Sequence, residues 1–164
     1  ASINISVLDL TRENFTQRLN HKMAQAGLDN SMLGVECLET EKLLASSQVL
    51  EELRLLRRKG FTVSLDDFGA GYSNLNYLLR IPLDVIKLDK SLIDDLLKQP
   101  SRRIIVRNVI RMLKELGYRV LAEGVEDETT AKIISDYACD EAQGYYFACP
   151  KTAVELEAWL AKWI

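Results

Sequence analysis

The strongest constraint on the fold is a repeated alternation between short apolar stretches and longer segments of helical period. The short stretches predict six strands, Ile3–Val7, Met32–Leu38, Phe61–Asp66, Asp84–Leu88, Tyr118–Glu123 and Ala142–Phe147. Because strand–helix–strand units are joined by right-handed crossovers, the alternation predicts an α/β fold on a parallel sheet. It leaves open whether that sheet is flat and doubly wound or belongs to a barrel.

The intervals between the predicted strands carry the helical pattern. The predicted helices are Thr11–Ala26, Glu41–Lys59, Arg102–Leu116, Asp127–Ala138 and Thr152–Ile164, with a shorter helical turn over Asn74–Arg80. Three of them stop at Gly27, Gly60 and Gly117, and glycine ends a helix in the left-handed conformation at little steric cost. No linker or break in composition divides residues 1–164, so we expect one domain.

The charge balance excludes some classes of protein. The 21 lysines and arginines face 24 aspartates and glutamates, which gives a net charge of −3. Binding to nucleic acid polymers through phosphates would need a basic surplus.

No apolar run approaches the roughly 20 residues of a membrane span, and no signal peptide opens the sequence. The three cysteines, Cys37, Cys139 and Cys149, lack metal-finger spacing, so we expect reduced core thiols in a cytoplasmic protein.

Polar residues gather where the predicted strands reach their carboxyl ends. These residues are Asn4, Glu36, Asp66, Asp67, Lys87, Glu123 and Gln143. Carboxylates are costly to bury at such positions unless something pairs with them. In an α/β barrel this end of the strands is where active sites are built.

Each of these residues also has a purely structural interpretation. Asp66 and Asp67 fit a helix-capping turn before a glycine-rich loop. Glu36 and Lys87 each fit a structural ion pair within an apolar strand, and Asn4 alone fits a turn. His21 lies on a predicted helix without a partner pattern, which favours a solvated or capping role over catalysis.

Taken together, the polar set favours a metal-dependent reaction. Carboxylate and amide oxygens suit Mg²⁺ or Mn²⁺, and no cluster of cysteine and histidine competes for zinc. Adjacent Asp66 and Asp67 suit a two-metal site that activates water for attack on a phosphodiester. Lys87 would then stabilise phosphoryl charge or orient the water, and Glu123 would take its proton.

Four motifs occur in an order and spacing that resemble the EAL-domain cyclic-di-GMP phosphodiesterases. They are Asp66–Leu75 (DDFGAGYSNL), Ile86–Ser91 (IKLDKS), Ala122–Glu126 (AEGVE) and Gln143–Phe147 (QGYYF). Asn4-Ile5-Ser6 resembles the Asn-x-Ser of the same family. The resemblance implies a modified (β/α)₈ barrel that opens one phosphodiester of cyclic-di-GMP to give linear 5′-pGpG, with Mg²⁺ or Mn²⁺, in bacterial second-messenger signalling.

The resemblance also implies a role for each matching residue. Asn4, Glu36 and Asp66 resemble metal ligands, and Asp67 resembles a ligand of the second metal. Lys87 resembles the lysine that contacts the nucleophilic water, Glu123 the general base or second-metal glutamate, and Gln143 the glutamine near substrate. Glu39 and Glu126 resemble the acids that hold the loop Asp66–Ser73, which couples dimerisation to activity in the family.

The sequence departs from the family pattern at some positions. Leu38 and Ala70 stand where the family usually has threonine, and the Glu-Ala-Leu tripeptide, whose glutamate is a metal ligand, occurs nowhere in the 164 residues. We expect that tripeptide ahead of Ala1, because the pattern gives about six βα units where the barrel needs eight. An open barrel exposes two strand edges, so we expect a homodimer, exchanged elements or a missing N-terminal segment.

Three functions fit these observations. The first is a metal-dependent cyclic-di-GMP phosphodiesterase in the intact domain, with the activity of this chain uncertain because the family glutamate is missing. The second is a catalytically inactive EAL domain that acts as a cyclic-di-GMP receptor or protein-interaction module. The third is an unrelated Mg²⁺-dependent barrel enzyme. The sequence leaves membrane anchoring of a parent protein open.

Overall fold

The protein is built on one parallel sheet. The computed structural model describes residues 1–38, 46–71 and 75–162. The strands are β1 (Ser2–Ile5), β2 (Gly34–Leu38), β3 (Thr62–Phe68), β4 (Val85–Leu88), β5 (Arg119–Ala122) and β6 (Glu141–Ala142). They lie side by side in sequence order, and every neighbouring pair is parallel. Within the described residues β1 and β6 do not pair with each other, so the sheet is open, as the six predicted units indicate.

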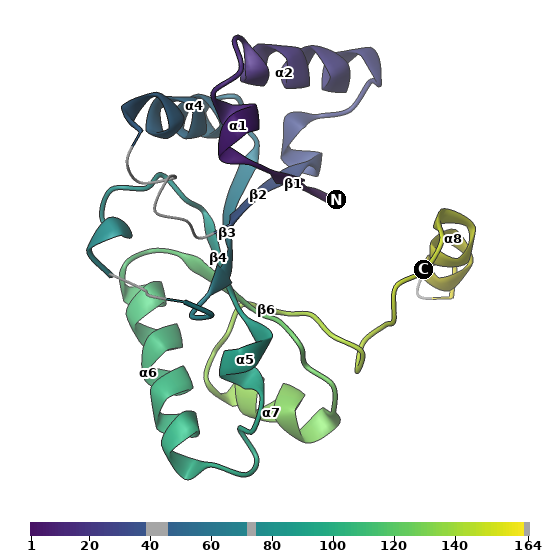
Figure 1. The fold of residues 1–164 in the computed structure, drawn as a ribbon. Helices are drawn as coiled ribbons and strands as arrows, with labels where there is room; N and C mark the ends of the chain where they lie inside the picture. Colours follow the sequence, from purple (N-terminus) through teal and green to yellow (C-terminus); the bar gives the residue numbers. More distant parts are fainter. Residues whose placement is uncertain (39–45, 72–74, 163–164) are drawn as a thin grey trace.

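Helices follow the strands in two groups. The helices are α1 (Val7–Leu10), α2 (Phe15–Gln25), α4 (Ser47–Arg58), α5 (Lys90–Ile93), α6 (Pro100–Glu115), α7 (Glu128–Asp136) and α8 (Ala153–Leu160), with 3₁₀ turns η1 (Asn30–Met32) and η2 (Leu75–Tyr77). Figure 1 shows α1, α2 and α4 near the first strands and α5, α6 and α7 near the last. None of the helices in the described ranges is long and apolar enough to cross a membrane.

The core lies on the face of the sheet that the helices cover. Alternate residues of the four central strands are almost completely buried there: Val35, Cys37, Val63, Leu65, Ile86, Leu88, Val120 and Ala122. From the helices, Leu53 and Leu56 of α4 and Ile110 and Leu113 of α6 are equally buried. Because successive strand residues point to opposite faces, the residues between these core positions point away from the helices. That second face carries the candidate site.

The first predicted strand and helix are divided differently in the structure. β1 ends at Ile5 because Ser6 and Asp9 form a capping box that starts α1 at Val7. Thr11 is therefore the C-cap of α1 and does not begin the next helix. α2 begins only at Phe15, after Asn14 in a left-handed conformation with φ of 56° and no side-chain cap.

The missing cap of α2 is supplied by another helix. Glu52 of α4 accepts a hydrogen bond from the backbone N–H of Thr16 at 2.8 Å. The first N–H groups of a helix have no partner within the helix, so this carboxylate satisfies one of them. It ties α2 to α4 across 36 positions of sequence.

The helix ends agree with the sequence analysis where glycine defines them. Gly27, Gly60 and Gly117 follow α2, α4 and α6 with φ of 68°, 91° and 90°. The beginnings shift by a few residues because local caps decide them: Ser46 caps α4, Pro100 opens α6, and Thr152 caps α8. Parts of the predicted segments Glu41–Lys59, Asn74–Arg80 and Thr152–Ile164 lie outside the described residues.

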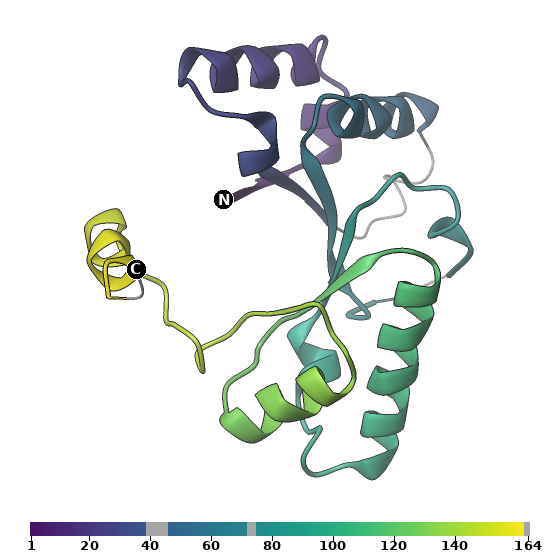
Figure 2. The same cartoon turned by 180° about the vertical axis from the view of Figure 1, so that it is seen from behind.

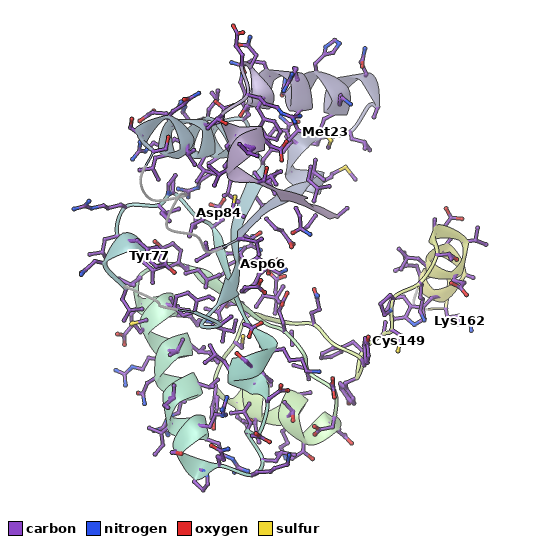
Figure 3. The ribbon with its side chains drawn as sticks, viewed as in Figure 1. Met23, Asp66, Tyr77, Asp84, Cys149 and Lys162 are labelled. Carbon is purple, nitrogen blue, oxygen red and sulfur yellow. The ribbon has the colours of Figure 1, made fainter. Side chains whose placement is uncertain are left out.

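The last predicted strand is mostly wrong. β6 covers only Glu141–Ala142, because the chain turns after Gly144. Tyr146 donates its N–H to the carbonyl of Val125, and Phe147 donates to the carbonyl of Gly144, so these residues cannot continue the ladder. The predicted core position of Cys149 is also wrong: this thiol is exposed on the segment that leads to α8, which Figures 1 to 3 show set apart from the sheet.

Candidate metal and phosphodiester site

The strand register brings polar residues of successive strands together. Asn4 is the register partner of Glu36, and Glu36 is the partner of Ser64, so these three share the face opposite the core. Lys87 and Glu123 point to the same face by alternation along β4 and β5. The carboxyl ends of these parallel strands therefore form one polar surface, as the sequence analysis predicts.

The ammonium group of Lys87 lies at the centre of this surface. Its Nζ is 2.8 Å from Glu36 Oε2, 2.8 Å from Asp66 Oδ1 and 2.7 Å from Glu123 Oε1. The three carboxylates come from β2, from β3 and from the residue after β5. Only 7 % of the Lys87 side chain is exposed. We call Lys87 and these three carboxylates the lysine cluster.

The buried charges of the lysine cluster are stabilised by pairing with one another. Burial is the largest influence on Lys87 and would lower the pKa of its ammonium, but hydrogen bonds to Asp66, Glu123 and Glu36 raise that pKa above the ordinary 10.5. Burial also raises the pKa of Glu123, while the hydrogen bond from Lys87 opposes that rise. A buried charge is tolerated where it is paired and hydrogen-bonded in this way.

A β-bulge delivers two consecutive aspartates to the site. The register between β3 and β4 shifts between Leu65 and Phe68, so Asp66 and Asp67 together lie opposite Lys87. Asp67 has a left-handed φ of 57°, and its N–H donates to Asp66 Oδ1 at 3.2 Å. In a regular strand two adjacent side chains point to opposite faces, and the bulge removes that restriction.

The aspartates and Glu123 form a set of oxygens suited to a hard divalent cation. One carboxylate oxygen each of Asp66, Asp67 and Glu123 lie within 4.8 Å of one another. Burial raises the pKa of Asp67, and the charges of Asp66 and Asp89 add to that rise, which a bound cation would relieve. Figure 3 shows Asp66 at the middle of the sheet, facing away from α6. The donor set fits a divalent metal ion.

The remaining predicted residues lie around this centre. Asn4 is exposed beside Glu36 on the edge strand. Gln143 directly follows β6, where its N–H donates to Ala122 and its carbonyl accepts from Val125. These backbone bonds fix Gln143 at the same end of the sheet as Glu123.

The two loop-holding acids remain predictions. Glu126 forms an exposed ion pair with Lys90 of α5, and no contact with the loop after β3 is seen among the described residues. Glu39 lies outside the described residues. The roles assigned to this pair from the resemblance therefore stay untested.

Asp89 is a residue near the site for which the sequence predicted no role. This residue follows β4 directly and caps α5 by accepting a hydrogen bond from the N–H of Ser91 at 2.9 Å. Its charge also raises the pKa of Asp67. Its position at the carboxyl end of a strand, two residues after Lys87, is the signal that identifies it.

These observations define a class of protein before any comparison. An open parallel α/β sheet carries a cluster of carboxylates around a lysine at the carboxyl ends of its strands, which is the active-site end of (β/α) barrels. The sequence profile of the EAL domain matches residues 1–150. The chain belongs to the EAL domain family.

Individual relatives agree with this assignment. The cyclic di-GMP phosphodiesterase PA2567 of Pseudomonas aeruginosa is 35 % identical over 98 % of this chain, which spans only 27 % of that relative. The crystal structure of the EAL domain of Mycobacterium smegmatis DcpA superposes with a TM-score of 0.91 at 32 % identity, covering 98 % of this chain and 72 % of that one.

A third comparison includes a metal and a ligand. The structure of Klebsiella pneumoniae BlrP1 in complex with manganese and cy-diGMP superposes with a TM-score of 0.77 at 32 % identity, covering 88 % of this chain and 38 % of that one. A protein of similar fold thus forms a complex with a divalent cation, which agrees with the oxygen donors of Asp66, Asp67 and Glu123.

Proposed function

We propose that this domain hydrolyses cyclic-di-GMP to linear 5′-pGpG with Mg²⁺ or Mn²⁺. The observation that carries the proposal is the convergence of Asp66, Asp67 and Glu123 beside Lys87. The relatives named as cyclic di-GMP phosphodiesterases support the substrate, and the hard oxygen donors support the metals.

The charge of the site explains why a cation is needed. Glu36, Asp66, Asp67 and Glu123 face the single ammonium of Lys87, so the site is strongly negative. A phosphodiester is an anion, and this surface repels it until positive charge is added. Asp66 and Asp67 are the ligands we assign to that charge, with Glu36, Glu123 and Asn4 beside them. A bound divalent cation supplies charge neutralisation and a more acidic water.

Each residue of the site then has its own role in the proposed reaction. Lys87 Nζ, buried and hydrogen-bonded, orients the attacking water and stabilises charge on the phosphoryl oxygens. Glu123 Oε1 accepts the proton of that water, and its raised pKa makes it a better base than an exposed glutamate. Gln143 contacts the substrate, and Glu39 and Glu126 hold the loop after β3.

We further propose a homodimer formed through an apolar hollow beside the site. The hollow has a volume of about 640 Å³ and lies between the loop after β3 and α6. Leu75, Ile104 and Ile105 on its walls are 47 %, 56 % and 54 % exposed. Phe68 and Gly69 join the hollow directly to the strand that carries Asp66 and Asp67, so a partner there would contact the site loop.

We extend the proposal to the domain organisation of the chain and to its location in the cell. We assign residues 1–164 to a single EAL domain. Its sheet has six strands within the described residues, where a (β/α)₈ barrel has eight. We place the domain in the bacterial cytoplasm, because its three free cysteines favour a reducing compartment and its relatives are bacterial.

Turnover with a matched pair of variants tests the function. The chain is incubated with cyclic-di-GMP and Mn²⁺, and linear product is measured by chromatography. Asp66→Asn should reduce the rate at least 100-fold, on the order of the loss expected for a catalytic electrostatic group. Asp95→Asn changes a partly exposed aspartate that pairs with Lys98, and should leave the rate unchanged. Binding without turnover would instead favour the receptor function.

A further inference from the structure

Lys87 contacts two of the three carboxylates that are grouped closely enough to hold a metal ion. Its Nζ contacts Asp66 Oδ1 and Glu123 Oε1 at 2.8 and 2.7 Å. The same two residues, with Asp67, supply the oxygens that lie within 4.8 Å of one another. An ammonium and a divalent cation thus share two of their three carboxylate partners.

The lysine cluster has a stabilising task that no other described cation performs. Glu36, Asp66 and Glu123 come from β2, from β3 and from the residue after β5, and in the described part of the chain each of them pairs with Lys87. Without this ammonium, three largely buried carboxylates would repel one another across β2, β3 and β5. Removing one partner of a buried ion pair leaves such charges uncompensated.

We infer that Lys87, in addition to the role proposed above, holds the metal-free site together and competes with the divalent cation for Asp66 and Glu123. This inference rests on the proposed metal site. Because the metal would take over part of the task, Lys87 stabilises the metal-free protein more than the metal-bound one. By thermodynamic linkage, loss of Lys87 must then tighten metal binding.

The test compares thermal unfolding and Mn²⁺ affinity in three forms of the chain. Lys87→Met keeps the length of the side chain and removes its charge. In EDTA its melting temperature should fall by roughly 5–10 °C, as expected for a broken buried ion pair. With saturating Mn²⁺ the fall should be less than half as large, and calorimetry should show Mn²⁺ binding about tenfold tighter than in wild type.

Two variants make the comparison specific. Lys90→Met removes a nearby exposed lysine that pairs with Glu126, and should change neither the melting temperature nor the affinity appreciably. Lys87→Arg keeps the charge and should retain most of the stability in EDTA. If Lys87→Met is unfolded in EDTA, recovery of native circular dichroism on adding Mn²⁺ supports the inference, and failure to recover contradicts it.

The outcomes separate this inference from the proposed function. Equal losses of stability with and without Mn²⁺, or equal or weaker Mn²⁺ binding by Lys87→Met, would overturn the competition while leaving the metal site in place. Absence of Mn²⁺ binding in wild type and in Lys87→Met would overturn both. Binding only by Lys87→Met would support the competition and contradict the proposed metal dependence of the wild-type chain.

Discussion

Asp67 follows Asp66 in a left-handed conformation, and this one backbone feature places two consecutive carboxylates opposite Lys87. The residue at position 67 must therefore supply a carboxylate and also tolerate a left-handed backbone conformation. Aspartate and asparagine tolerate a φ of 57° better than other side chains with a Cβ atom, whereas β-branched residues do not. The position therefore limits which substitutions preserve the fold.

Two substitutions at Asp67 should separate these effects. Asp67→Asn should keep the stability within about 0.5 kcal/mol and weaken Mn²⁺ binding about tenfold, because it removes a charged ligand without disturbing the bulge. Asp67→Val should in addition destabilise the fold by about 2 kcal/mol. Urea unfolding measures the stability of both variants, and Mn²⁺ titration measures their affinity for the ion. Equal stability of the two variants would argue against strain at this residue.

A second prediction concerns the cap that α4 provides for α2. Glu52→Ala removes the acceptor for the Thr16 N–H and should lower the free energy of unfolding by about 1 kcal/mol, as for other lost helix caps. Glu52→Gln keeps an acceptor oxygen and should lose less. Glu51→Ala is the control, since Glu51 is exposed and pairs only with Arg54 in the described contacts. An equal loss in Glu51→Ala would show that removal of any carboxylate from α4, and not loss of the cap, is responsible.

Gly144 should be intolerant of any side chain. A Cβ atom there would lie 2.1 Å from the carbonyl oxygen of Val125, whose backbone is itself paired with Gln143 and Tyr146. Gly144→Ala should cost about 3 kcal/mol, at the upper end of overpacking effects. Gly71→Ala meets open space and should cost far less. Urea unfolding measures the free energy of unfolding of both variants. Similar losses of stability in the two would contradict the close contact at Gly144.

Acid should weaken the contact between α6 and the strand edge at Asp140. Burial is the largest influence and raises the pKa of Asp140, but Lys114, the N–H of Val120 and Arg119 together hold it below 3.8. Because the folded-state pKa is lower than the unfolded one, the contribution is present above pH 3.8 and is lost as pH falls below it.

The variant Asp140→Asn isolates this contribution. It should lower the free energy of unfolding by about 1 kcal/mol at pH 7, and the difference from wild type should shrink as the pH falls below 3.8. Stability measured by urea unfolding across that range provides the check. A difference that does not change with pH would mean that the ion pair with Lys114 contributes nothing.

Much of the fold could be predicted because each strand carries its own signal. Val63 and Leu65, like Ile86 and Leu88, alternate with polar residues and are bounded by turns or glycine, so strand positions follow from local pattern. The errors lie where a long-range contact decides. Glu52 sets the start of α2 from 36 residues away, and the backbone of Val125 turns the chain after Gly144.

The site was predictable as a set of residues but not as a geometry. Position at the carboxyl ends of strands identifies Glu36, Asp66, Lys87 and Glu123, and all four meet in the structure. The bulge at Asp67 could not be predicted, because it appears only when the register of β3 against β4 is known. The ion pairs of Lys87 with three carboxylates could not be predicted either, because they join strands that lie far apart in the sequence.

The location of bound metal tests the central claim most directly. Crystals of the chain soaked in Mn²⁺ would be measured at the manganese absorption edge, and anomalous difference density would mark the ion. The account predicts a peak bonded to the carboxylates of Asp66 and Asp67, about 2.1 Å from their oxygens, the distance of small hard cations. No peak there, or a peak only at other acidic residues such as Asp94 or Asp127, would contradict it.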